Sequence, residues 1–121
     1  MPKFVLFLRD TGKYPNMSPD EMQAVVQRYV AWRAKVQQNG GSIMGHKLQD
    51  KGGRVLNGAG GALKITDGPY AEAREVMGGL FVIEAANYDE VAELAKDCPH
   101  LEFGSIEIRE VQPTPSAPPR S

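Results

Sequence analysis

The sequence predicts an α+β fold, on three observations about the spacing of its apolar residues. Two short runs, 4–8 and 80–83, are apolar at every position, which is typical of strands buried on both faces. A long segment after Ser18 repeats apolar residues at helical spacing, and a shorter one after Asn87 does the same. Strands and helices are therefore expected to share one core.

The first helix is predicted both by its start and by its apolar stripe. Ser18 can cap a free backbone amide, Pro19 suits the first helical position, and Glu21 completes a capping box. Gly40 and Gly41 are expected to end the helix. The stripe between these limits consists of Met22, Val25, Val26, Tyr29, Trp32 and Val36.

The rest of the chain reads as short strands and one further helix. The second helix starts at Asn87, with Glu90 three places later, and ends before Pro99. A loop is expected at 10–16 and a single helical turn at 70–76. The remaining strands are expected at 43–49, 54–56, 62–66, 79–85 and 105–111.

This order of elements resembles a ferredoxin-like sandwich, in which both helices cover one face of an antiparallel sheet. The other face of such a sheet should be polar in a monomer, yet the strands at 4–8 and 80–83 are apolar throughout. The simplest cover is a second copy packed sheet to sheet, which gives an isologous homodimer. The alternative covers are the hairpin at 40–61 and the tail of the chain.

Length, charge and cysteine content restrict the class of protein. The 121 residues suit one domain, expected at 1–112, followed by a Pro-rich tail at 113–121 that is predicted to be disordered. A net charge of -1 with scattered Lys and Arg argues against direct nucleic-acid binding. The single cysteine, Cys98, excludes an internal disulfide and a thiolate zinc site.

No segment predicts a membrane, a metal or a cofactor. No apolar run approaches the roughly 18 residues needed to span a bilayer, and the N-terminus lacks signal-peptide features, so a cytoplasmic location is expected. Neither a GxGxxG nor a Walker spacing accompanies Gly78 and Gly79, which read as a close backbone approach. Two histidines without a third clear ligand predict no metal site.

One stretch, 65–80, carries a recognisable pattern: a Thr-Asp-Gly-Pro-aromatic turn, an Ala-Glu pair, a basic-Glu pair, then Gly-Gly before a strand. Three further pieces accompany it, Gly-His-Lys-Leu at 45–48, Cys-Pro-His-Leu at 98–101 and Ile-Glu-Ile-Arg at 106–109. Together they resemble the DGPF signature of the YCII-related proteins, over about residues 3–111.

The resemblance implies a dimeric α+β barrel, in which ferredoxin-like units pair through their sheets and each keeps a cleft between helix and sheet. It implies less about activity, because most such proteins are uncharacterised. Some are encoded near, or fused to, sigma-factor modules, and a few relatives carry out elimination or dehalogenation with a His-Asp pair. Those relatives place the His on the first helix, where this chain has Tyr29 and Trp32 and no His.

Three residues are candidates for catalysis, each with a structural alternative. Strand alternation puts His46 on one face with Met44 and Leu48, either as a hydrogen-bonded interior residue or as a proton carrier. Asp67 is either a turn cap or an orienting carboxylate at the mouth of the cleft. His100 either bonds the last carbonyls of the preceding helix or contributes to the site.

Four residues are candidates for ligand binding. Tyr29 and Trp32 continue the stripe of the first helix, so they either pack in the core or shape a cleft. Tyr70 and Arg74 flank the turn, and Arg74 alternatively belongs to a solvated charge cluster with its glutamate neighbours. Cys98, on the buried stripe of the second helix, reads as a structural thiol.

The leading functional hypothesis is a small-molecule site in the helix–sheet cleft, with acid–base chemistry such as elimination or isomerisation. His46 would move the proton, Asp67 would orient it, and Tyr29 and Trp32 would shape the pocket. The alternative is a non-catalytic ligand-binding or regulatory module that acts with sigma-factor or other transcription machinery. A purely structural dimerisation module is the third reading.

Overall fold

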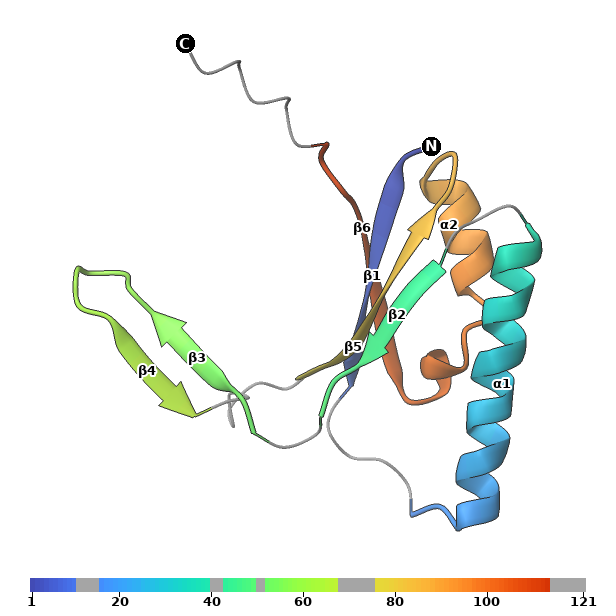
Figure 1. The fold of residues 1–121 in the computed structure, drawn as a ribbon, viewed down its shortest axis with the longest axis horizontal. Helices are drawn as coiled ribbons and strands as arrows, with labels where there is room; N and C mark the ends of the chain where they lie inside the picture. Colours follow the sequence, from blue (N-terminus) through green and yellow to red (C-terminus); the bar gives the residue numbers. More distant parts are fainter. Residues whose placement is uncertain (11–15, 40–42, 50–51, 68–75, 114–121) are drawn as a thin grey trace.

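The computed structural model of the chain describes residues 1–10, 16–39, 43–49, 52–67 and 76–113. The α+β fold predicted from the sequence is confirmed: two helices lie on one face of an antiparallel sheet (Figure 1). The elements are β1 (Lys3–Asp10), α1 (Pro19–Gln38), β2 (Ile43–Lys47), β3 (Arg54–Asn57), β4 (Lys64–Asp67), β5 (Val76–Glu84), α2 (Tyr88–Ala95), the 3-10 helix η1 (Pro99–Glu102) and β6 (Gly104–Glu110).

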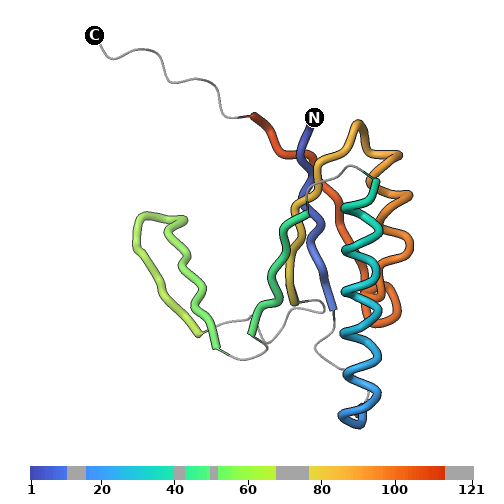
Figure 2. The backbone as a smooth tube through the Cα atoms, turned by 45° about the vertical axis from the view of Figure 1, so that its right-hand side comes forward, coloured from blue at the N-terminus to red at the C-terminus, as the bar shows by residue number. Residues whose placement is uncertain are grey.

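The main sheet has four strands in the order β2-β5-β1-β6, and every neighbouring pair is antiparallel. The strands β3 and β4 form a separate two-stranded hairpin. Figures 1 and 2 both show this hairpin on the side of the sheet that faces away from the helices. The helices therefore cover one face of the sheet, and we call the opposite one the open face.

Burial alternates along β1 and identifies the face that the helices cover. Phe4, Leu6 and Leu8 are buried there, while Val5 and Phe7 point to the open face and are only half-buried. The register continues this division across β5, where Ile83 and Phe81 lie beside Phe4 and Leu6 on the helix side. The open face is apolar along the middle of β1 and β5, as the sequence indicated, and the described residues of this chain only half-bury it. Its β6 side is polar, because Glu107 and Arg109 lie opposite Phe7 and Val5.

Both helices begin at the residues predicted from their caps. The Ser18 hydroxyl accepts a hydrogen bond from the Glu21 amide at 3.2 Å, and the Glu21 carboxylate accepts one from the Ser18 amide at 3.4 Å. In α2 the Asn87 side chain accepts from the Glu90 amide at 2.9 Å. Local hydrogen bonding therefore sets both starting points.

Two boundaries near the cavity differ from the expectation. Asp10 was expected in a loop but is the last residue of β1, and its side chain is buried on the helix side. Val76 is the first residue of β5, so the helical turn expected at 70–76 is wrong at its last residue and otherwise lies outside the described residues. Of the described helices, none is both long and apolar enough to cross a membrane.

Candidate functional site

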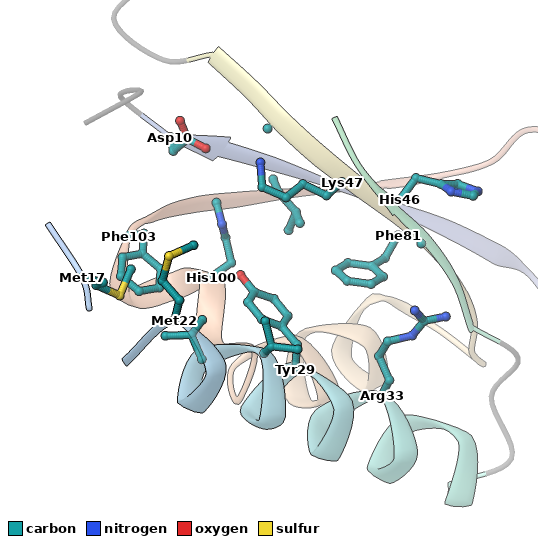
Figure 3. A pocket seen from close by; sticks show the side chains of 15 residues that line it. Asp10, Met17, Met22, Tyr29, Arg33, His46, Lys47, Phe81, His100 and Phe103 are labelled. Atoms are coloured by element: carbon teal, nitrogen blue, oxygen red, sulfur yellow. The ribbon is translucent and has the colours of Figure 1, made fainter. Parts of the chain in front are cut away.

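A cavity of about 560 Å³ lies between α1 and the sheet (Figure 3). It follows α1 from Met22 to Arg33, and β1, β2, β5 and η1 supply its other walls. Met22 and Val26 belong to the apolar stripe of the helix and yet are exposed, because the start of α1 projects past the end of the sheet (Figure 1). The apolar part of the wall includes Leu8, Met17, Met22, Val25, Phe81 and Phe103.

The space for the Phe81 ring exists because residue 45 has no side chain. A Cβ atom at Gly45 would lie 2.1 Å from Cδ1 of Phe81, far inside van der Waals contact. The ring packs edge-on against Trp32, with centroids 5.1 Å apart, and the Arg33 guanidinium lies 5.9 Å from its centroid. These contacts hold Phe81 as one wall of the cavity.

Polar groups are also exposed to the cavity, and the most buried of them are His100 and Asp10. The Nε2 atom of His100 lies 2.9 Å from the backbone carbonyl oxygen of Arg9. Because a carbonyl oxygen can only accept, Nε2 carries the proton, and in a neutral ring Nδ1 is then the basic nitrogen. The fold therefore specifies the tautomer of a buried histidine.

Gly104 makes this approach of His100 possible. A Cβ atom there would lie 2.0 Å from the Arg9 carbonyl oxygen and 3.0 Å from Nε2 of His100. Gly104 is paired with Asp10 across the β1–β6 ladder, so the same contact region also places the Asp10 carboxylate at the cavity. The start of β6 and the end of β1 thus position the polar side of the site.

Tyr29 and Lys47 reach the cavity from opposite walls. Figure 3 shows the Tyr29 phenol extending from α1 between His100 and Phe81. Burial, with a smaller contribution from the negative charge that Cys98 would carry, raises the pKa of Tyr29 to about 12. Its hydroxyl therefore stays protonated at neutral pH and can donate a hydrogen bond. Lys47 lies on the helix side of β2, and its ammonium group donates to the Leu48 carbonyl at 3.1 Å.

Cys98 packs beneath this region as a structural thiol. It is buried in the core cluster, and desolvation raises its pKa to about 11, although the backbone amide of His100 counters part of this effect. A thiol that resists ionisation is a poor nucleophile at neutral pH.

His46 lies on the other face of the sheet from this cavity. The β2–β5 register puts Met44 and His46 opposite Val82 and Leu80 on the open face, and Gly45 and Lys47 on the helix side. Figure 3 shows the imidazole of His46 pointing away from the cavity, although the residue is among those that line it. His46 is exposed, so a single chain gives it no interior position among apolar neighbours.

Asp67 is also distant from the cavity lining. It ends β4 on the hairpin, 3.2 Å from the Arg54 guanidinium, with 91% of its side chain exposed. Trp32 lies in the core, and its indole N–H donates to the Leu94 carbonyl at 2.8 Å. Within one chain, then, the structure brings together Tyr29 and His100, separates them from His46 and Asp67, and uses Trp32 as packing. Tyr70 and Arg74 lie outside the described residues.

Several cavity residues were missed from the sequence, although some had a signal. Asp10 continues the every-second-residue pattern of Phe4, Leu6 and Leu8, which predicts a carboxylate on the same face as the core. Lys47 follows from the same alternation in β2 once Gly45 is known to face the helix. Met17 and Phe103 lie outside the regular elements, so no periodicity pointed to them.

Within the part of the chain that the structure describes, no three His, Cys, Asp or Glu side chains group as a metal site.

The comparisons with known proteins identify a family. No curated protein matches the chain. The family model of the YCII-related domain matches residues 3–115, which is nearly the whole chain and includes both the cavity and the hairpin. The chain therefore belongs to the YCII-related domain family.

Proposed function

We propose that the cavity between α1 and the sheet binds a small, largely apolar molecule that carries a polar group. The composition of the wall supports this: Val25, Phe81 and their neighbours are apolar, and His100, Tyr29 and Asp10 add groups that can hydrogen-bond. A volume of about 560 Å³ falls within the range of small-molecule sites.

We further propose that any chemistry here is acid–base, of the elimination or isomerisation type, with His100 as the proton carrier in place of His46. The hydrogen bond from Nε2 to the Arg9 carbonyl leaves Nδ1 of the neutral ring as the base. The Tyr29 hydroxyl can donate to an oxygen that becomes negative during the reaction. The buried Asp10 carboxyl group also borders the cavity and can accept a hydrogen bond from the ligand.

The protein acts, in this proposal, as a homodimer joined through the open faces of two sheets. Val5, Phe7, Leu80 and Val82 lie on that face in adjacent strands, and none is buried within the chain. Covering such a surface with a second copy removes apolar area from water at both sheets. The cytoplasmic location stays a prediction from the sequence.

Ligand binding is tested by filling the cavity. The probe is 8-anilinonaphthalene-1-sulfonate, an amphipathic anion whose fluorescence rises in apolar sites. Val25→Trp places an indole in the cavity and should weaken probe binding at least tenfold, whereas Val30→Trp on the exposed surface of α1 should not change it. Equal affinity of the two variants for the probe would mean that the probe does not bind in the cavity.

The chemistry is tested on the first substrate found to be turned over. His100→Gln should lower kcat by about 100-fold or more, because a general acid or base contributes roughly that much, and should leave KM nearly unchanged. His46→Gln and Asp67→Asn should retain full turnover. Full turnover by His100→Gln, with loss of turnover in the His46 and Asp67 variants, would assign the acid–base chemistry to His46 and Asp67 instead. Tight binding without turnover by any ligand would favour the non-catalytic, regulatory alternative.

A further inference from the structure

The β3–β4 hairpin has one apolar face that the described residues of its own chain leave uncovered. Leu56 and Ile65 are paired across the two strands, so they lie on the same face. They are 62% and 57% exposed, and Leu63, at the entrance to β4, is 64% exposed. The opposite face carries the Val55–Thr66 pair and polar neighbours. The hairpin is therefore amphipathic, with its apolar face in solvent.

A two-stranded hairpin is at best marginally stable in water unless it packs against something. This hairpin forms its own sheet, separate from the four-stranded one. Its apolar residues stay mostly exposed, so their burial adds little to the stability of a single chain. The hairpin needs a covering surface.

The position of the hairpin indicates which molecule provides that surface. Figures 1 and 2 show it standing on the open-face side of the main sheet, so a body that covers the open face meets the hairpin as well. On the strand nearest to it in sequence, Met44 is exposed on the same open face. The hairpin therefore stands beside the surface at which the two sheets are proposed to pair.

Charge favours a second copy as the occupant. At the base of the apolar face, Arg54 and Asp67 neutralise each other at 3.2 Å. Because the two charges cancel, the face attracts neither a strongly acidic nor a strongly basic partner. The whole chain carries a net charge of -1, so two copies repel one another little.

We infer that the β3–β4 hairpin is an arm that packs its apolar face onto the second copy of the chain. In an isologous dimer the arm of each copy packs on the other copy, so the contact made by Leu56 and Ile65 occurs twice, once for each chain. This inference rests on the proposed homodimer and adds to it a second contact outside the sheet faces.

Sedimentation equilibrium of the full-length chain tests the arm. Leu56→Thr with Ile65→Thr keeps strand-forming side chains but removes the apolar surface, and should raise the dimer dissociation constant at least tenfold. The control, Lys64→Thr, changes the other face of the hairpin and should leave the constant within twofold. If the wild type is dimeric and the double variant has the same dimer dissociation constant, the hairpin makes no stabilising contact with the second copy. That result would overturn the inference, while the dimer formed through the sheet faces would remain possible.

Two further outcomes separate failure of the arm from failure of the dimer. If the wild type is monomeric at all concentrations, the dimer itself is absent and the arm is lost with it. A photo-crosslinking residue, p-benzoylphenylalanine, at position 56 should join two differently tagged copies, and at position 64 should not. Crosslinks from position 56 only to the main sheet of the same copy would show that the hairpin folds back, which overturns the inference.

Discussion

At Gly45 a missing side chain controls the shape of the cavity, because a Cβ atom would lie 2.1 Å from the Phe81 ring. Gly45→Ala should displace that ring and its edge-on contact with Trp32, and lower the free energy of unfolding by about 1–3 kcal/mol, as overpacking does. Urea unfolding followed by circular dichroism measures the change. The matched control is Gly58→Ala, where a Cβ meets nothing within 4 Å. Equal stability of the two variants would contradict the close fit.

Tyr29 offers a pH-dependent readout of the same cavity. Burial raises its pKa from 10.0 to about 12, so the folded state favours the neutral phenol. The resulting stabilisation is present below pH 10 and is lost as the pH rises through 12. The difference in absorbance at 295 nm between wild type and Tyr29→Phe should therefore have its midpoint near 12, with circular dichroism confirming the fold. A midpoint near 10 would mean that the phenol is solvated.

At the scale of elements, the two helices are joined by one directed hydrogen bond. The indole N–H of Trp32 on α1 donates to the Leu94 carbonyl on α2 at 2.8 Å. Trp32→Phe retains an aromatic ring but leaves that carbonyl without its donor, which should cost about 1–3 kcal/mol of unfolding free energy. Chemical unfolding monitored by far-UV circular dichroism measures this loss. A change below about 0.5 kcal/mol would mean that water replaces the donor.

The elements themselves could be predicted where local chemistry determines them. The capping residues and apolar stripes predicted both helix starts, since each capping side chain bonds an amide three residues later. Alternation also showed that Met44 and His46 share a face of β2. It could not show whether that face lies under the helices, because this depends on which side of the sheet α1 packs. His46 was therefore a reasonable candidate from sequence, and the structure puts His100 in the cavity instead.

The position of the hairpin could not be predicted for a similar reason. The hairpin expected at 40–61 is wrong in its pairing, because β2 pairs with β5 and β3 pairs with β4. At the tip of the observed hairpin, Gly60 and Gly61 adopt positive φ angles of 91° and 93°. Nothing in the sequence of β3 or β4 specifies what their apolar face contacts. The polar site could not be predicted for the same reason: His100 and Asp10 are 90 residues apart in sequence and line one cavity only because β6 pairs with β1.

At the scale of the whole molecule, the cavity and the open face lie on opposite sides of one sheet. Alternate residues of β5 serve the two sides: Phe81 faces the cavity, while Leu80 and Val82 face outward. A second copy on the open face would therefore support the strands that carry the site from the side opposite the cavity. In this arrangement, dimer formation and ligand binding are supported by different residues and can be perturbed separately.

Leu80→Glu tests that separation. Leu80 lies between Phe7 and His46 on the open face, so a carboxylate there would lose its hydration in a sheet-to-sheet dimer, a cost that one neighbouring imidazole does not offset. The variant should be monomeric by light scattering at concentrations where the wild type is dimeric, and it should still bind the anilinonaphthalene probe. Gln27→Glu adds the same charge to the exposed surface of α1 and should remain dimeric. If Leu80→Glu keeps the mass of a dimer, the chains associate through another surface, because removing a carboxylate from water between the two sheets would cost more than its contact with His46 offsets.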